Sequence, residues 1–168
     1  MKTTKLIWLA GIISITFGLQ SNGQTKQIFA GRWAINLDKS QFNDAPHYTA
    51  ARQIKVSQAD DQINLELVLE SDAGADSVTN QILPLNGKDL EIVGADQRTR
   101  KIIAQFANDG KTLIVITNAS APDDPQTNQF TSTDTWSLSD DGKTLVIKKV
   151  VKVATGFSYT INAVYDKK

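Results

Sequence analysis

The sequence predicts an all-β fold, an antiparallel up-and-down β-barrel of about 8–10 strands, with a β-sandwich as the alternative. Three observations predict it. Apolar and polar residues alternate with period two along most of the chain, which is typical of half-buried strands. Short glycine-containing turn sequences separate these runs, and no segment carries a helical stripe over three turns. The chain has 168 residues, of which 40% are hydrophobic and 21% charged, and this length and composition indicate one globular domain.

The first strand candidate covers residues 29–37, where Trp33 and Ile35 alternate with Ala34 and Asn36. The best candidate for a helix is a single turn at residues 38–42. The remaining strand candidates are, in order, residues 51–58, 62–69, 77–84, 89–93, 98–106, 111–117, 128–138, 143–154 and 157–165.

The connections between these runs indicate hairpins. Asp109-Gly110 and Asp141-Gly142 each lie between two β runs, and Asn86-Gly87 and Thr155-Gly156 have the same character. Glycine adopts the positive φ angle of a tight turn at low steric cost. A meander of such hairpins that closes on itself removes exposed sheet edges.

Residues 1–23 are predicted to be a secretory signal peptide. Lys2 and Lys5 precede an uncharged run of about 13 residues, which is short of the roughly 20 that a membrane-spanning helix needs. Ser21 and Gly23 then place small residues at the −3 and −1 positions of a cut before Gln24. We expect residues 24–168 to form one soluble domain without an integral membrane segment, exported to the periplasm or out of the cell. A permanent N-terminal anchor is the alternative.

Charge and composition exclude several functions. The 18 Lys and Arg balance 18 Asp and Glu, so the chain lacks the basic excess on which nucleic-acid binding relies. Because there is no cysteine, disulfides, thiolate zinc sites and cysteine nucleophiles are excluded. The single histidine, His47, cannot form a multi-histidine metal site and has no neighbouring nucleophile motif. We therefore predict no metal and no cofactor, assign no catalytic residue, and favour a protein that is not an enzyme.

The motif Gly31-x-Trp33 on the first strand resembles the start of the lipocalins and of lipocalin-like secreted bacterial proteins. Residues 136–145 resemble a group of uncharacterised secreted bacterial proteins. The resemblance implies that Gly31 and Trp33 close one end of an up-and-down barrel whose other end admits a small apolar ligand. Two family features differ: Thr133-Asp134 is not followed by the family's tyrosine, and no arginine follows Arg100 to pack across the tryptophan.

Several polar residues fall on the same alternating face as apolar ones, so we predict that they lie inside the barrel. A buried charge is costly, and each should therefore pair, reach the mouth or meet a polar ligand group. In the first hypothesis, one of the basic residues grips an anionic head group and a tyrosine adds a hydroxyl. In the alternative, these residues end in water, pair with one another, or lie after a bulge that resets the phase. The candidate ligand-binding residues are Arg52, Asn80, Arg100, Asp134, Lys149 and Tyr159.

Three functions remain. The favoured one is an exported barrel that binds a small apolar or amphipathic molecule, with an anionic one included. The second is a structural or interaction module of the cell envelope with a filled core. The third, ranked last, is a hydrolase or isomerase that uses carboxylates in the barrel mouth.

Overall fold

The computed structural model describes residues 28–71, 74–94, 96–123 and 129–168. The predicted signal peptide, residues 1–23, lies outside these ranges, and its cleavage near Gly23 stays a prediction. Within the described ranges, no helix is long and apolar enough to cross a membrane.

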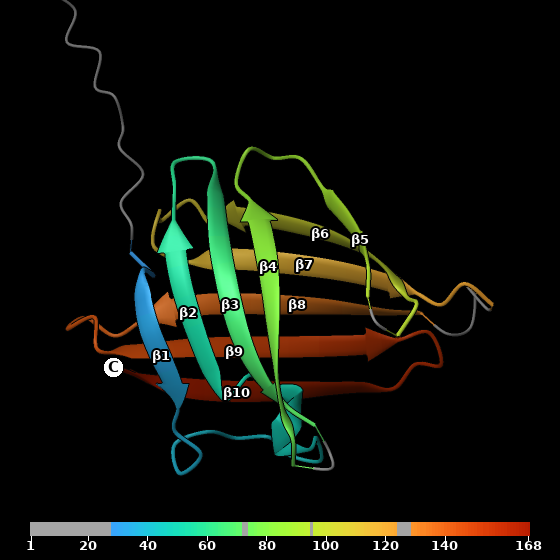
Figure 1. The fold of residues 1–168 in the computed structure, drawn as a ribbon, viewed down its shortest axis with the longest axis horizontal. Helices are drawn as coiled ribbons and strands as arrows, with labels where there is room; N and C mark the ends of the chain where they lie inside the picture. Colours follow the sequence, from blue (N-terminus) through green and yellow to red (C-terminus); the bar gives the residue numbers. More distant parts are fainter. Residues whose placement is uncertain (1–27, 72–73, 95, 124–128) are drawn as a thin grey trace, which may run out of the picture.

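Ten antiparallel strands form a single sheet that curls into a nearly closed barrel (Figure 1). The order across the sheet is β4-β3-β2-β1-β10-β9-β8-β7-β6-β5, so the first and last strands pair and β4 and β5 are the two edges. This single sheet confirms the predicted barrel and excludes the sandwich. The strands are β1 (Gly31–Ile35), β2 (Gln53–Gln58), β3 (Gln62–Glu70), β4 (Asp76–Pro84), β5 (Leu90–Val93), β6 (Thr99–Phe106), β7 (Leu113–Ser120), β8 (Gln129–Leu138), β9 (Thr144–Val153) and β10 (Ser158–Lys167).

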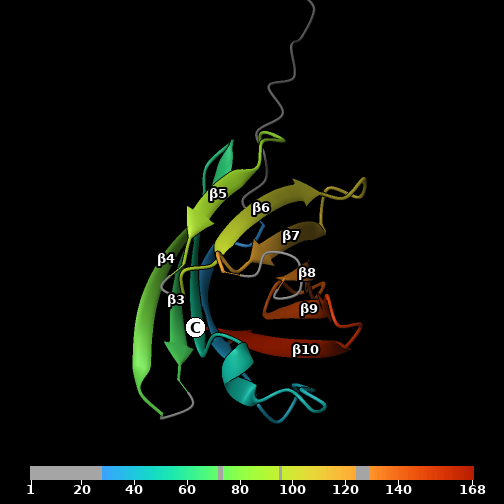
Figure 2. The same cartoon turned by 90° about the vertical axis from the view of Figure 1, so that its right-hand side faces the viewer.

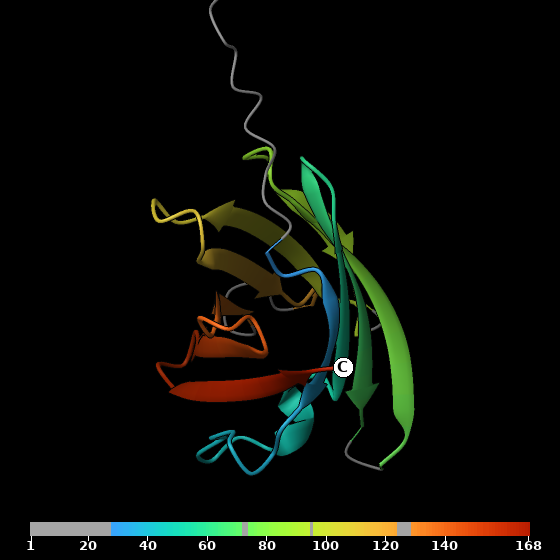
Figure 3. The ribbon, with the colours of Figure 1, turned by 90° about the vertical axis from the view of Figure 1, so that its left-hand side faces the viewer.

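The curled sheet brings two groups of strands face to face. In Figure 1, β1 to β4 run crosswise in front of β6 to β10. Figures 2 and 3, which view the barrel from its two sides, show both groups wrapping around one interior. Side chains that alternate inward on both groups therefore meet in a common core.

Every predicted strand is present, with small shifts at its ends. The predicted helical turn at residues 38–42 is wrong. Gln41 instead forms an isolated β-bridge with Asn162 of β10, with N–O distances of 2.9 and 2.8 Å. The one helical element in the described residues is a 3₁₀ turn, η1 (His47–Thr49), which follows Pro46 and lies at one end of the barrel (Figure 1).

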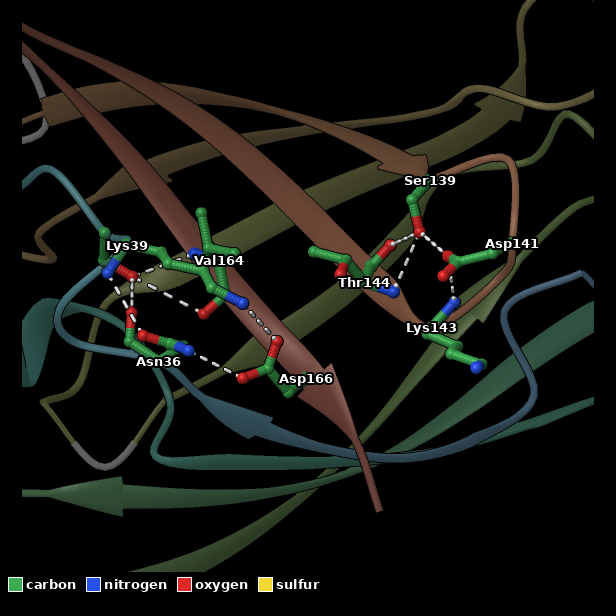
Figure 4. A network of polar contacts seen from close by, with 9 residues as sticks. Asn36, Lys39, Ser139, Asp141, Lys143, Thr144, Val164 and Asp166 are labelled. Carbon is green, nitrogen blue, oxygen red and sulfur yellow. Dashed lines mark hydrogen bonds and ion pairs between the residues drawn. The ribbon is translucent and has the colours of Figure 1, made fainter.

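The connection that follows β1 is held against β10 (Figure 4). Asn36 Nδ2 donates a hydrogen bond of 2.6 Å to Asp166 Oδ2, and Lys39 Nζ lies 3.2 Å from Asp166 Oδ1. These two contacts hold the pKa of Asp166 below its usual value, with the Asn36 hydrogen bond as the larger cause. The backbone N–H of Val164 donates to Ser40 Oγ at 2.9 Å.

Turn carboxylates bind their own backbone. Asp109 Oδ1 accepts hydrogen bonds from the backbone N–H groups of Lys111 and Thr112, and its Oδ2 accepts one from Thr112 Oγ1 at 2.7 Å. The Thr112 hydroxyl is the main cause that lowers the pKa of Asp109 to about 2. Gly110 follows with a φ of +63°, which a residue with a Cβ rarely adopts. In the β8–β9 turn, Asp141 Oδ1 accepts hydrogen bonds from the Ser139 hydroxyl at 2.6 Å and from the backbone N–H of Lys143 at 3.0 Å (Figure 4).

Aromatic rings fill one end of the barrel. The Phe29 ring stacks on Phe106 with centroids 6.2 Å apart and meets Trp136 edge to face at 5.8 Å. Trp33 is fully buried, and its Nε1 donates a hydrogen bond of 2.9 Å to the Phe29 carbonyl. Stacked and edge-to-face rings pack closely, so side chains fill this end of the barrel interior.

A lysine near the end of β10 lies beside the buried Trp33 ring. Lys167 Nζ lies 5.2 Å from the centroid of the Trp33 ring, within cation–π distance. Gly31 has a φ of +143°, and a Cβ there would lie 3.1 Å from Lys167 Cε. Glycine at this position therefore leaves room for the lysine stem beside the tryptophan.

Candidate binding cavity

Beyond the aromatic end, the barrel interior encloses a cavity of about 540 Å³. This volume lies within the range of about 300–1,000 Å³ that is typical of small-molecule sites. Strands β2 to β10 contribute to its wall, together with residues 49–51 at the end of η1 and just after it. Most of the wall is apolar, from the side chains of Ala51, Ile54, Leu65, Leu67, Leu69, Leu83, Ile102, Val115, Phe130, Ile147, Ile161 and Ala163.

Polar groups occupy part of the same wall. Two of its charged side chains come from the paired strands β8 and β9, and two from the β5–β6 hairpin. The polar and charged members are Thr49, Thr79, Asn80, Gln81, Asp96, Arg100, Thr117, Ser132, Asp134, Lys149 and the hydroxyl-bearing Tyr165. Within the described ranges, no group of three or more His, Cys, Asp or Glu residues is placed to hold a metal ion.

Asp134 and Lys149 form an ion pair on the cavity wall. They are opposite each other on β8 and β9, and Lys149 Nζ lies 3.5 Å from Asp134 Oδ2. Burial raises the pKa of Asp134, while Lys149 and Ser132 oppose that rise. The side chains keep 19% (Asp134) and 31% (Lys149) of their surface accessible. The pair is therefore more buried than a surface salt bridge and still open on one side.

Two buried polar atoms beside this pair have no hydrogen-bond partner among the described residues. They are Asp134 Oδ1 and Trp136 Nε1, from two residues of β8 that both line the cavity. Native proteins satisfy most buried polar atoms, so this cluster departs from the usual pattern. Tyr165 faces the same region: burial, and then the charge of Asp134, raise the pKa of its hydroxyl.

Arg100 and Asp96 form a second ion pair on the wall. Arg100 Nη1 lies 2.8 Å from Asp96 Oδ1 and Nη2 lies 2.7 Å from Oδ2, which is bidentate geometry. This contact raises the pKa of Arg100 and is the main cause that lowers the pKa of Asp96 to about 2. Gly94 lies beneath the pair, where a Cβ would overlap the guanidinium group of Arg100.

Of the six predicted ligand-binding residues, four line the cavity, namely Asn80, Arg100, Asp134 and Lys149. Arg52 and Tyr159 lie elsewhere. Arg52 precedes β2 at the end of the barrel, where its Nη1 donates to Asp76 Oδ1 at 2.9 Å and its Nε lies 3.9 Å from Glu70 Oε2. Tyr159, near the start of β10, packs against the Phe157 ring with centroids 6.0 Å apart.

The predicted inward face of β4 is wrong, although Asn80 reaches the rim. Its supposed companions Val78 and Ile82 are 64% and 47% exposed, on the outer surface. Gln81 is opposite Leu65 of β3, so the inward face carries Gln81 and its in-phase neighbours. Because β4 is an edge strand, residues from both of its faces border the cavity.

The sequence reasoning missed several wall residues, although the signal was present for most of them. Tyr165 alternates with Ile161 and Ala163 on β10, and Ser132 alternates with Asp134 on β8. Their inward positions follow from the same period-two pattern. Asp96 is different, because it belongs to a turn and no alternation places it.

Three crystal structures of the fluorescent protein UnaG have a similar fold. The wild-type protein has a TM-score of 0.52 at 15% sequence identity over 83% of this chain and 97% of that one. Two single-residue variants of UnaG give TM-scores of 0.54 and 0.51 at 15% and 16% identity, and cover 96% and 95% of their own chains. No family model and no curated protein matches the chain. At this identity the likeness shows the β-barrel fold alone.

Proposed function

We propose that this protein binds a small amphipathic molecule inside its barrel. The observation that carries the proposal is the cavity of about 540 Å³ in a barrel whose other end is closely packed. Protein interiors have few voids larger than a water molecule, so an open space of this size is typical of a binding site.

The composition of the wall supports an amphipathic ligand. Leu65, Ile102 and Ile161 represent the apolar majority, against which a hydrocarbon or ring system loses contact with water. The Asp134–Lys149 pair and the neighbouring hydroxyl and amide groups supply the few polar contacts that fix orientation. A structural module with a filled core is disfavoured by the same cavity.

The proposal includes export of the protein. It rests on the basic and then apolar start of the chain, with Ser21 and Gly23 before the predicted cut. The mass of the protein isolated from its own host tests this point: a chain that begins at Gln24 agrees with export and cleavage, and an intact N-terminus contradicts the cleaved signal peptide.

The binding proposal is tested by filling the cavity. Ala163 is 3% exposed and lines the cavity, so Ala163→Phe places a ring in the space that a ligand would occupy. Val150 lies on the opposite face of the neighbouring strand β9, so Val150→Phe adds the same bulk outside the barrel. The reporter is N-phenyl-1-naphthylamine, an uncharged dye whose fluorescence rises in apolar surroundings.

We expect the wild-type protein and Val150→Phe to bind the dye with equal affinity, and Ala163→Phe to lose at least tenfold. Circular dichroism checks that both variants keep their β structure. If Ala163→Phe binds the dye as tightly as the wild-type protein, the cavity is not the binding site.

A further inference from the structure

The ion pairs on the cavity wall bear on the charge of the ligand, an inference that rests on the proposed function. Four charged side chains line the cavity, two basic and two acidic, and each basic group already has a carboxylate partner within the wall. The charges of these four lining side chains therefore balance. Arg98, which does not line the cavity, also approaches Asp96, with its Nε 3.4 Å from Asp96 Oδ2.

Both terminal nitrogens of Arg100 already donate hydrogen bonds to Asp96. Its bidentate contact with Asp96 uses the edge of the guanidinium group that would otherwise hold a ligand carboxylate. An anion that displaced Asp96 from Arg100 would replace one guanidinium–carboxylate contact with another. It would also lie close to the negative charge of the displaced Asp96. Binding of an anion here brings no new ion pair.

The positive charge of Lys149 is compensated by the carboxylate of Asp134. Its Nζ lies 3.5 Å from Asp134 Oδ2, and Asp134 is the more buried of the two side chains. An anionic group that approached Lys149 would also approach Asp134, in a region where water screens the repulsion less than at the protein surface. A cationic group that approached Asp134 would likewise be repelled by the neighbouring Lys149.

The uncharged polar groups of the wall remain available to a ligand. Gln81 offers an amide, while Thr117 and Tyr165 offer hydroxyls, all on the cavity surface. Each hydroxyl donates and accepts, and the amide does both through separate atoms. This set matches a ligand group that also donates and accepts without carrying charge.

The geometry points to an uncharged amphipathic ligand, whose polar end is an amide or hydroxyl group that hydrogen-bonds to the wall beside the Asp134–Lys149 pair. Carboxylates and ammonium groups on the same apolar chain are rejected. This replaces the anionic head group expected from the sequence, because Arg100 and Lys149 each have a partner that alternation alone did not reveal.

The test compares four ligands that share one alkyl chain: decanamide, 1-decanol, decanoate and decylammonium. Each is titrated against the wild-type protein, freed of bound lipid on a hydrophobic resin and loaded with N-phenyl-1-naphthylamine at pH 7.5. We expect decanamide and 1-decanol to displace the dye at concentrations at least tenfold lower than decanoate and decylammonium require. Decanoate that competes as well as decanamide would overturn the inference.

Two variants, each of which removes one wall carboxylate, test whether the ion pairs cause this preference. Asp134→Asn leaves Lys149 without its carboxylate, and Asp96→Asn does the same for Arg100. We expect each to strengthen decanoate binding at least tenfold relative to decanamide binding. Asp141→Asn removes the same charge from an exposed turn outside the cavity and serves as the control.

The outcomes separate this inference from the proposed function. If neither the dye nor any of the four ligands binds the wild-type protein, the proposed function fails and the inference with it. If the ligands bind but decanoate gains no affinity in either variant, binding stands and the charge argument is wrong. Asp96 lies in an exposed turn, so Asp96→Asn gives an answer even if Asp134→Asn does not fold.

Discussion

Removal of Lys149 is the sharpest test of the electrostatics of the cavity wall. Lys149→Met keeps most of the side-chain length and leaves Asp134 facing an apolar group in place of an ammonium 3.5 Å away. Asp134 Oδ1 already lacks a hydrogen-bond partner among the described residues, so its charge then has little compensation. The folded state should lose stability at neutral pH.

The size of the loss follows from the burial of the pair. Removing one partner of a fully buried pair costs about 3–5 kcal/mol, whereas an exposed pair contributes about 0.2–1 kcal/mol. With Asp134 at 19% and Lys149 at 31% exposure, this pair lies between those limits. We expect a loss of about 2 kcal/mol in the free energy of unfolding, or about 4–8 °C in melting temperature for a chain of this size.

The loss should depend on pH in a defined direction. Burial raises the pKa of Asp134 above its ordinary value of 3.8, and removal of Lys149 raises it further. A group with a raised folded-state pKa stabilises the fold below the unfolded-state pKa, and this contribution is lost as the pH rises through the folded-state value. Lys149→Met should therefore recover stability as the pH falls from 7 towards 4.

The assay is thermal unfolding followed by circular dichroism at pH 7.5, 5.5 and 4.5. Lys148→Met is the matched control, because Lys148 is the exposed neighbour on the outer face of β9. At each pH, the melting temperature of Lys149→Met is compared with that of Lys148→Met. Equal stability of the two variants at pH 7.5, or a difference that does not shrink in acid, would show that Lys149 does not compensate a buried charge on Asp134.

Three further predictions concern the frame of the barrel. Asp109→Ala should lower the melting temperature at neutral pH, because its turn carboxylate accepts three hydrogen bonds. The pKa of Asp109 is depressed to about 2, so its contribution is present above the unfolded-state value and is lost as the pH falls through about 2. Melting curves between pH 4 and 2 should show the wild-type protein and this variant converging, and a constant gap would contradict the assignment. Gly31→Ala should cost about 1–3 kcal/mol, because alanine is strained at a φ of +143° and its Cβ crowds Lys167. Urea unfolding measures this cost, and an unchanged midpoint would contradict it. Trp33→Phe leaves the buried Phe29 carbonyl without its donor and should cost about 1–3 kcal/mol. Guanidinium unfolding should show a smaller loss for Trp136→Phe, whose Nε1 has no partner among the described residues, and equal losses would count against this role of Trp33.

The strands were predictable because each needs only local information. In β9, Leu145, Ile147 and Val151 alternate with polar or outward residues, and the Asp141-Gly142 turn fixes where the strand begins. The pairing of β1 with β10 joins the two ends of the domain, and no local pattern encodes it. The general need to cover exposed sheet edges favours closure of the barrel. A sandwich can also cover its edges, so the sequence did not decide between the two.

The site was predictable where alternation ran unbroken through a strand. Asp134 and Lys149 lie in the middle of β8 and β9, so the phase of their apolar neighbours placed them inward. Arg52 precedes β2 by one residue, where a long side chain reaches the carboxylates of the next hairpin. Asn80 was assigned the wrong face, since the outer surface of β4 carries the apolar Val78 and Ile82.

The partners of the charged residues could not be predicted from periodicity. Asp96 lies in the β5–β6 turn, and its bidentate contact with Arg100 depends on how that turn folds back over Gly94. The pairing of Asp134 with Lys149 depends on the register between two strands. These two contacts set the balance of charge on the cavity wall, and the alternation of residues along single strands does not show them.

Native mass spectrometry of the protein purified from its own host, followed by denaturing extraction of anything bound, tests whether the barrel holds a small molecule. We expect a discrete additional mass that is released as an uncharged amphipathic molecule small enough for a cavity of about 540 Å³. A bare protein mass, with no adduct regained after incubation with a lipid extract of that host, would contradict it.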